Sequence, residues 1–431
     1  MTFIRRARIR GIVPFALAAA LAGSVGAGTA AASPTAAPQP GPLASLSTQL
    51  DDVARAVAPT PDPFYSHAPI AAGTPLGTVL RSEPAQVPLV TAQVPGVRAS
   101  RILYVTTGAH GNRDAASAVV LVPPQRPSDK SRALIASGIA DESLGAYCRP
   151  TSSLDNTSPV SRFRNSGPFD SAMPSLRAGH TVLVADLVND GGPAPAASLL
   201  PRTSGHALLD GARAALHLPG TGLDASSTVA LYGPSGGGAG AAAFGAELAP
   251  TYAPDLHIPA AVLGQIVPDH HNFIKANSGS VGAGFAFADL LGLQVGHPEM
   301  RIDEKLNPLG RKVAEVFRSS CTFPAYTALS HLPLEALFEP GHSPYAEADY
   351  RTAFATQALA TPTSPTPTAT LRITRCDSNL SPVSVTPVGD IAGAASAYRA
   401  AGADVSTRVV SCLGSVTDVY APDLAWLLEQ V

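Results

Sequence analysis

Ser235 stands in a setting that suits a nucleophile. Residues 233–237 read Gly-Pro-Ser-Gly-Gly and directly follow the apolar run at residues 229–232. A serine hydroxyl is a poor nucleophile until a neighbouring base removes its proton. A sharp turn from a strand into a helix exposes such a hydroxyl, and small residues on both sides relieve the crowding of the backbone there. Ser235 is therefore the candidate nucleophile for acyl-transfer chemistry.

Acyl transfer also needs N–H groups that stabilise the oxyanion formed when a carbonyl is attacked. The N–H of Gly236, which directly follows the serine, is the first candidate. The second donor is expected from the loop after an earlier strand, and Gly138, just past the apolar run at residues 133–136, is the candidate there. The His-Gly pair that often occupies that loop is absent from this segment.

A base for Ser235 is hard to find in the sequence. The last histidine of the chain is His342, so the C-terminal segment, where a base should follow the last strand, contains no imidazole. His342 is the fallback candidate for the base. The adjacent histidines at residues 270–271 are a second alternative, with Asp269 or Asp303 as the carboxylate that orients the imidazole. Any such base must come within hydrogen-bond reach of the serine in a fixed tautomer.

Metal chemistry is not indicated by these histidines. Two adjacent residues do not share a helix face, and no H-x-x-x-H motif or nearby group of carboxylates completes a ligand set. We therefore expect neither a metal nor a cofactor.

Short apolar runs alternate with helix-like segments along most of the chain. Strands are expected at residues 102–105, 118–122, 133–136, 181–185, 229–232, 260–263, 371–374 and 405–410. Helices are expected at residues 204–217, 239–248 and 422–431. Short apolar strands separated by helices are typical of a mostly parallel sheet with helices on both faces. The sequence therefore predicts an α/β fold.

Residues 266–360 lose the strand pattern. They carry helix-like segments around residues 285–293, 303–317 and 332–338. We interpret this part as a helical cap, inserted over the carboxyl edge of the sheet within one domain at residues 61–431. Phe285 and Phe287 could line an acyl-chain groove or belong to the core of the cap. Residues 361–370, rich in threonine and proline, are expected to link the cap to the last two strands.

The N-terminal segment has the pattern of an export signal. Four arginines precede an alanine-rich apolar stretch that ends in small residues, which predicts a signal peptide at residues 1–32 with cleavage near Ala32. Residues 33–60, rich in alanine and proline, are expected to form a linker or an N-terminal arm. No later segment is long and apolar enough to span a bilayer, so we expect a secreted protein without a stable membrane span.

Charge narrows the class of partner. The net charge is −3, and losing the four arginines of the signal peptide makes it about −7, which argues against nucleic acid as a partner. Four cysteines in an exported chain favour two disulfides over thiols or metal ligands. Composition alone allows three connectivities and leaves the oligomeric state open.

Several segments resemble the secretory lipase family of fungi and actinobacteria, of the lipase A type. The resemblance lies at residues 62–65, 73–81, 148–151, 205–218, 231–237 and 247–254. It implies the α/β-hydrolase fold and hydrolysis of triacylglycerols or other carboxylic esters by a serine triad under a helical cap. Ser235 falls on the family's nucleophile, so an ester or lipid is the expected substrate or ligand.

The other two triad positions do not match the family's pattern. The family's acid loop falls on residues 374–383, where Asp377 is the carboxylate present, while a count back from Gly402 places Val383 at the acid instead. The family's histidine falls on residues 409–416, where a serine, Ser415, lies at or near that position. Asp377 is therefore a weak candidate for the acid, and no residue matches the base.

The resemblance also suggests how the cysteines pair. Cys376 and Cys412 each lie just past one of the last two strands, where the acid and base should face each other, and neighbouring loops there can meet disulfide geometry. We predict Cys376–Cys412, which leaves Cys148–Cys321 to tie the oxyanion-side loop to the cap. A bridge would then occupy the space of the acid–histidine pair. Two functions remain open: a secreted ester hydrolase, and a catalytically inactive relative that binds an acyl or ester ligand or a partner in the cell envelope.

Overall fold

The computed structural model describes residues 62–124, 131–138, 144–145, 148–149, 151, 154, 169, 172–187, 199–319, 326–378, 385–412 and 416–431. The chain divides into two units, Met1–Leu43 and Ala44–Val431, and every described residue belongs to the second. The predicted signal peptide, its cleavage near Ala32 and the arm at residues 33–60 lie outside the described residues.

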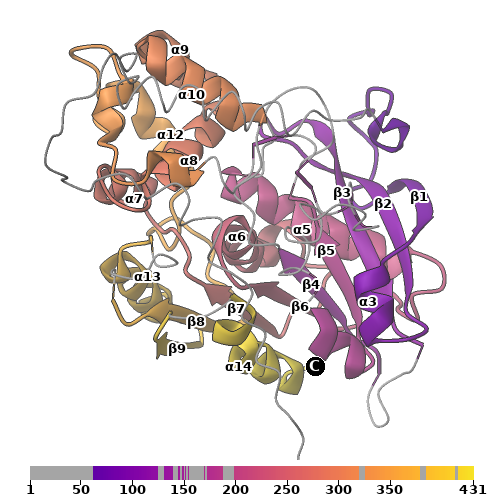
Figure 1. The fold of residues 1–431 in the computed structure, drawn as a ribbon. Helices are drawn as coiled ribbons and strands as arrows, with labels where there is room; N and C mark the ends of the chain where they lie inside the picture. Colours follow the sequence, from indigo (N-terminus) through magenta and orange to yellow (C-terminus); the bar gives the residue numbers. More distant parts are fainter. Residues whose placement is uncertain are drawn as a thin grey trace, which may run out of the picture. The chain divides into compact units, whose positions relative to one another are not determined.

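Nine strands within the described residues form one sheet in the order β1-β2-β3-β5-β4-β6-β7-β8-β9 (Figure 1). Their bounds are β1 Val79–Ala85, β2 Arg98–Thr107, β3 Arg113–Val122, β4 Leu134–Gly138, β5 Thr181–Ala185, β6 Val229–Gly233, β7 Ala260–Gly264, β8 Thr370–Cys376 and β9 Val405–Val410. The pairs from β1 through β3 to β5 are antiparallel. From β5 through β4, β6, β7 and β8 to β9 every pair is parallel. The expectation of a mostly parallel sheet is confirmed.

The central strands are buried on both faces, which explains their uninterrupted apolar sequence. Every residue of β4, β5, β6 and β7 is buried. Leu231 of β6 lies against α6 (Gly236–Tyr252), whereas its neighbour Tyr232 faces the charge of Asp423 in α14 (Val416–Glu429). Because successive side chains of a strand point to opposite faces, α6 and α14 cover opposite faces of the sheet.

Two further helices lie on the α6 side. Helix α5 (Pro201–His217) packs along α6, where the Cα of Gly205 approaches Phe244 so closely that an added Cβ would lie 2.7 Å from its side chain. Helix α13 (Val388–Ala400) joins them through the hydroxyl of Tyr398, which donates to the buried Glu247 of α6 at 2.9 Å. Helix α3 (Pro88–Gln93) lies near β1 at the other end of the sheet (Figure 1).

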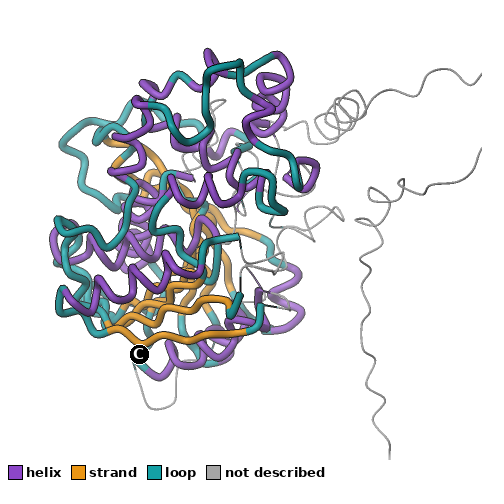
Figure 2. The backbone as a smooth tube through the Cα atoms, turned by 90° about the vertical axis from the view of Figure 1, so that its left-hand side faces the viewer, coloured by secondary structure: helices purple, strands orange, loops and turns teal. Residues whose placement is uncertain are grey.

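The segment between β7 and β8 is built from helices with a core of their own. These are α7 His270–Asn277, α8 Ala283–Gly296, η4 Pro298–Met300, α9 Ile302–Lys305, α10 Pro308–Ser319, η5 Tyr326–Leu329, η6 Leu334–Leu337, η7 Ala348–Tyr350 and α12 Arg351–Thr356. They gather at the top of Figure 1, where α7 to α12 are labelled, and helices joined by loops occupy the same upper part of the tube in Figure 2. Phe287 is fully buried in this core, 5.6 Å from the ring of Phe317. That this helical segment acts as a cap over a binding site stays a prediction.

The helix expected at residues 303–317 is two helices. Helix α9 ends before Leu306, which forms an isolated bridge with Phe338, and α10 starts anew at Pro308. A proline favours the first turn of a helix, because its missing N–H is not needed there. The strand β1 has no counterpart among the predicted strands.

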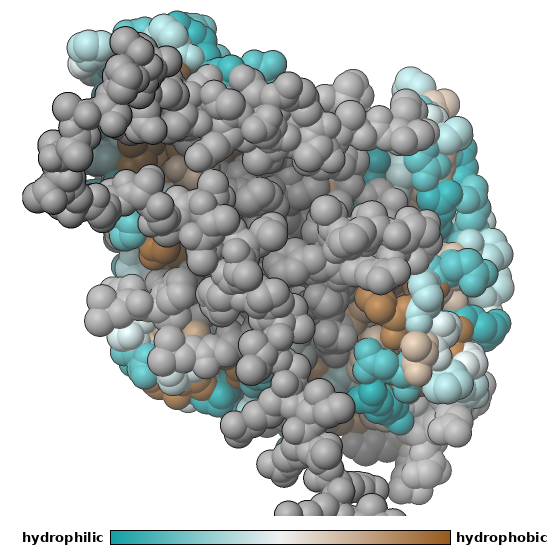
Figure 3. All heavy atoms as spheres, viewed as in Figure 1, coloured by the Kyte–Doolittle hydropathy of each residue, from teal (hydrophilic) through white to brown (hydrophobic). Residues whose placement is uncertain are grey.

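Among the described residues, no helix is long and apolar enough to cross a membrane. On the face shown in Figure 3, hydrophilic side chains predominate along the right-hand margin, with hydrophobic side chains in small groups between them.

Candidate functional site

The turn between β6 and α6 places Ser235 directly before the helix. Its backbone is extended, with φ −173° and ψ 169°, and the positive φ of the turn falls on Gly236 at 52°. The carbonyl of Ser235 accepts the N–H of Ala239 at 3.0 Å, so the serine caps the helix through its backbone. Its side chain is partly exposed and forms no hydrogen bond with any residue that the structure describes. The serine is thus presented, partly exposed, at the start of a helix.

Glycines allow the strands to approach this turn closely. A Cβ on Gly233 would lie 2.4 Å from the carbonyl oxygen of Gly238, so a larger residue does not fit at the start of the motif. A Cβ on Gly138, at the end of β4, would lie 2.7 Å from the Cα of the same Gly238. Gly138 therefore lies against the first turn of α6, the helix that begins directly after Ser235. The oxyanion roles of Gly138 and Gly236 stay predictions, because the chain after Gly138 lies outside the described residues.

The end of β5, next to β4 in the sheet, carries a buried carboxylate that the sequence did not identify as functional. Asp186 directly follows β5 and accepts the hydroxyl of Ser117 at 2.5 Å and the N–H of Thr151 at 3.1 Å. The hydroxyl of Thr151 donates to the same carboxylate. Burial raises the pKa of Asp186 above the ordinary range, although these hydrogen bonds and the charge of Arg149 oppose the rise. Asp186 thus ties the segment around Thr151 to the sheet, and an aspartate that ends an apolar strand was the available signal.

Arg149 in the same segment stacks on Tyr65, its guanidinium 3.3 Å from the ring centroid. Cys148 is disulfide-bonded. Cys321, its predicted partner, lies outside the described residues.

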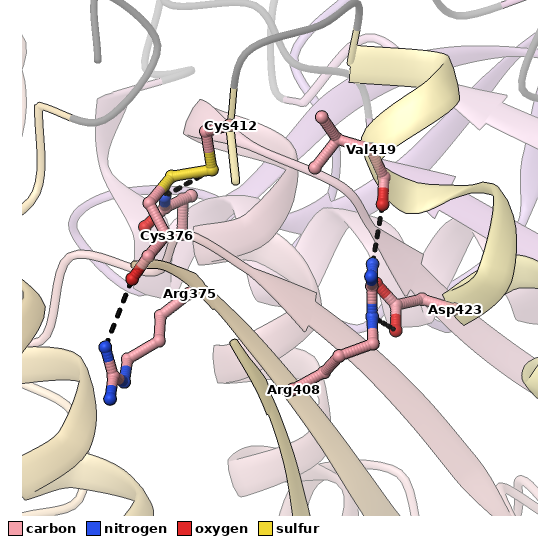
Figure 4. Close-up of a disulfide and its surroundings, with 7 residues drawn as sticks. Arg375, Cys376, Arg408, Cys412, Val419 and Asp423 are labelled. Carbon is pink, nitrogen blue, oxygen red and sulfur yellow. Dashed lines mark hydrogen bonds and ion pairs between the residues drawn. A yellow bond between two sulfur atoms is a disulfide. The ribbon is translucent and has the colours of Figure 1, made fainter. Parts of the chain in front are cut away.

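The predicted disulfide lies at the ends of β8 and β9, which follow β7 on the other side of β6 in the sheet. Cys376, the last residue of β8, is joined to Cys412, just past β9, with Cα atoms 5.5 Å apart. The pairing Cys376–Cys412 is thereby confirmed. Figure 4 shows the bridge spanning the ends of the two strands, with Arg375 turned away from it and donating to the carbonyl of Cys376.

Gln265 covers this bridge from the neighbouring strand. It directly follows β7 with a positive φ of 53°, and its backbone N–H donates to Thr374 of β8 at 2.9 Å. Its Nε2 donates to Sγ of Cys376 and lies 3.5 Å from Sγ of Cys412. A buried side-chain amide therefore takes up space beside the bridge at the edge of the sheet.

A second buried carboxylate, Asp423, lies beside this edge but is already bound. It accepts a hydrogen bond from Nε of Arg408 at 2.7 Å (Figure 4). The hydroxyl of Thr374 also donates to it, at 2.8 Å. These contacts fasten α14 to β8 and β9, so the carboxylate serves the packing of the last helix.

Asp377, the candidate acid, is exposed just past the disulfide. Its N–H donates to the carbonyl of Val410 at 2.8 Å, which extends the pairing of β8 and β9 by one residue. Its carboxylate makes no hydrogen bond with a described residue. Val383 and Ser415, the other positions compared with the family's acid and histidine, lie outside the described residues. The acid role of Asp377 stays a prediction.

All eleven histidines of the chain lie within the described residues, and none of them hydrogen-bonds to Ser235. His342, the fallback base, is 40% exposed and faces Glu347, with Nδ1 3.4 Å from the carboxylate. His206 of α5 stacks on Tyr252 with the ring centroids 4.2 Å apart, and burial with the charge of Arg202 lowers its pKa to about 4.

One histidine–aspartate pair lies within the helical segment. Nδ1 of His270 is 2.8 Å from Oδ2 of Asp289, and both side chains are nearly buried. Burial by itself lowers the pKa of His270, but the charge and hydrogen bond of Asp289 raise it overall. The orienting carboxylate is therefore Asp289, whereas Asp269 caps α7 and Asp303 pairs with Arg318. Nε2 of His270 is buried without a hydrogen-bond partner among the described residues, so it makes no hydrogen bond to Ser235.

Among the described residues, no group of three or more histidine, cysteine, aspartate or glutamate side chains is arranged to hold a metal ion.

Comparison with known proteins identifies a family match and relatives of similar sequence. The family model described as secretory lipase matches residues 169–405. A protein of Mycobacterium tuberculosis named a probable inactive lipase is 30% identical over 279 residues, which cover 64% of this chain and 61% of that protein. A secreted triacylglycerol lipase of Malassezia furfur is 30% identical over 270 residues, covering 62% of this chain and 56% of that protein. The chain thus matches less than two thirds of the length of these relatives.

Solved structures show the fold. The closed state of Candida antarctica lipase A superposes with a TM-score of 0.73 at 23% identity, covering 86% of this chain and 85% of that one. An esterase of Xanthomonas oryzae that degrades rice cell walls gives a TM-score of 0.60 at 17% identity, covering 81% and 95%.

Proposed function

Because this chain belongs to the secretory lipase family and has the α/β-hydrolase fold, we propose that it is an exported ester- or lipid-binding protein whose hydrolysis through Ser235 is severely impaired. One observation carries the proposal: all eleven histidines are described, and none hydrogen-bonds to the hydroxyl of Ser235. Export rests on the N-terminal signal pattern and on relatives that are named secreted lipases.

The lack of an imidazole beside Ser235 determines how far the rate of ester hydrolysis falls. A serine in water keeps its proton at neutral pH, so attack on an ester needs a base within hydrogen-bond distance. Removing the histidine of a serine triad costs on the order of 10^6 in kcat and leaves the contribution of the oxyanion hole and of binding. The remaining activity would be too low for a lipase that turns over its substrate at a useful rate.

The disulfide gives a second reason. In the resembling family the acid and the histidine follow the two strands that Cys376 and Cys412 end here. The bridge and the amide of Gln265 hold these two strand ends together, and neither group accepts a proton from a serine near neutral pH. The name of the Mycobacterium tuberculosis relative, a probable inactive lipase, fits this view.

The parts of the site other than the acid and the base support binding of a ligand. The turn that carries Ser235, the close approach of Gly138 to α6 and the helical segment between β7 and β8 are all present. An acyl chain with an ester group is the ligand that this family's architecture accepts. The partly exposed position of Ser235, at the turn from β6 into α6, favours a second candidate, a slow ester hydrolase.

Two assays on the disulfide-intact protein separate these functions. Turnover of p-nitrophenyl esters of several acyl lengths should equal that of the Ser235→Ala variant, while a non-hydrolysable alkyl ether of the same length should bind saturably in calorimetry. Turnover that vanishes in Ser235→Ala would establish the hydrolase instead. Absence of saturable binding for every chain length would refute the ligand-binding role.

A further inference from the structure

Residues 361–370 form a partly exposed, hydroxyl-rich segment outside the site described above. Their sequence, Thr-Pro-Thr-Ser-Pro-Thr-Pro-Thr-Ala-Thr, holds five threonines and three prolines in ten residues. The segment follows α12 and leads directly into β8. Threonine- and proline-rich stretches of exported proteins are typical acceptors of O-linked sugars. We propose that Thr363, Thr366 and Thr368 are O-glycosylation sites.

The hydroxyls of this segment fall into two groups. Thr361 and Ser364 bond to each other at 2.9 Å, and Thr370 is tied to Asp404 at 3.1 Å. The three proposed acceptors are instead exposed. Thr368 makes no side-chain hydrogen bond with any described residue. The other two proposed acceptors make hydrogen bonds of 3.3 Å. Thr366 bonds to the carbonyl of Ala401, and Thr363 bonds to the hydroxyl of Thr361.

The prolines keep this segment out of helices and sheets, so that its backbone stays accessible to a glycosyltransferase. Pro362, Pro365 and Pro367 have no N–H and a fixed φ, so the segment does not continue α12 or join a sheet. Residues 365–368 adopt no helix or strand. Pro367 and Ala369 are buried, which anchors the segment while the threonines between and beside them point outward.

The segment lies at the edge of the sheet opposite to Ser235. The N–H of Thr370 donates to Pro259, just before β7, at 2.8 Å, and this is the amino edge of the parallel strands. The seven residues of β8 separate this edge from Cys376 by about 20 Å. A sugar here therefore leaves the ligand site open and enlarges the polar surface of an exported protein.

The reaction is an ordinary glycosyl transfer from an activated sugar phosphate, either lipid-linked or nucleotide-linked. The threonine oxygen forms a bond to the anomeric carbon of the sugar, and the bond between that carbon and the phosphate oxygen breaks. The hydroxyl proton passes to a base of the transferase, and the phosphate leaves with the electron pair.

Mass spectrometry of the exported protein from its own host tests the proposal. Trypsin cuts after Arg351 and Arg372, so one peptide, residues 352–372, carries the whole segment, and residues 400–408 with exposed Thr407 supply the control peptide. The first peptide should gain the mass of whole sugar residues, lost on alkaline β-elimination, and the control peptide should not.

A variant with all three acceptors changed to valine should lose the added mass and keep the reactivity of Ser235 unchanged. An unmodified peptide 352–372 in the exported protein, or sugar that persists in the triple variant, would overturn the assignment. Neither result bears on the proposed function, because the sugar would lie at the amino ends of the parallel strands, whereas Ser235 lies at their carboxyl ends.

Discussion

The strand ends on the two sides of Ser235 are held in different ways. Beside it, where β4 and β5 end, the buried Asp186 holds the segment around Thr151 by hydrogen bonds. Where β8 and β9 end, a covalent bridge between Cys376 and Cys412 takes that role. The first side is held by buried hydrogen bonds, while the second is held by a covalent bond.

This difference shows which part of a lipase site the fold itself requires. The turn at Ser235 and the glycine at the end of β4 are needed for close packing of strand and helix, whatever the chemistry. An acid and an imidazole at the ends of β8 and β9 are not needed for packing, so a disulfide can stand there without disturbing the sheet. Retention of the serine alone is therefore no measure of activity.

The largest loss of stability is expected on removal of the disulfide at the ends of β8 and β9. Replacing Cys376 and Cys412 together by serine should lower the free energy of unfolding by about 4 kcal/mol, because the bridge spans 36 residues and restricts the unfolded chain. Urea unfolding measures the loss. Ester turnover should stay at the wild-type level, since the double variant gains no imidazole. A gain in turnover would show that the bridge, and not the missing base, suppresses the chemistry.

On the hydrogen-bonded side, Asp186→Ala should cost about 3 kcal/mol, because Ser117 and Thr151 lose their buried acceptor. Thermal unfolding at neutral pH checks this. A loss below about 1 kcal/mol would mean that the segment around Thr151 is held by other contacts.

Asp186→Asn isolates the charge. Burial raises the pKa of Asp186 above the ordinary 3.8, so its stabilising contribution is complete below pH 3.8 and is lost as the pH rises through the folded-state pKa. The stability lead of the wild type over Asp186→Asn should therefore shrink as the pH rises above about 3.8. A lead that grows with pH would show that the charged carboxylate is the favoured form.

A smaller effect is expected at the end of β4. Gly138→Ala should destabilise the protein by about 2 kcal/mol, because the new methyl group would meet the backbone of Gly238. Gly393→Ala is the matched control, since an added Cβ in this helix meets nothing within 4 Å and should stabilise by about 0.5 kcal/mol. Equal responses of the two variants in thermal unfolding would contradict the tight packing at Gly138.

The sequence predicted much of the fold because its central strands are apolar on both faces. The run at residues 229–232 and the strand at 260–263 fall within β6 and β7. Strand β1 escaped prediction because Arg81, Glu83 and Pro84 interrupt any apolar run at this edge of the sheet.

Side-chain partners were harder to foresee. The disulfide Cys376–Cys412 followed from two strand ends that share an edge, a constraint that the fold imposes. The pairing of His270 with Asp289 joins two different helices, and the contact of Gln265 with the bridge depends on a positive φ. Neither leaves a local pattern in the sequence.

The reactivity of Ser235 toward a fluorophosphonate tests the central claim most directly, because this reagent labels serines that a base has activated. We predict that Ser235 is labelled no faster than the exposed Ser82, with Ser235→Ala and Ser82→Ala as matched variants read by peptide mass spectrometry. Rapid labelling that disappears in Ser235→Ala and persists in Ser82→Ala would contradict the account and show that Ser235 has a working base.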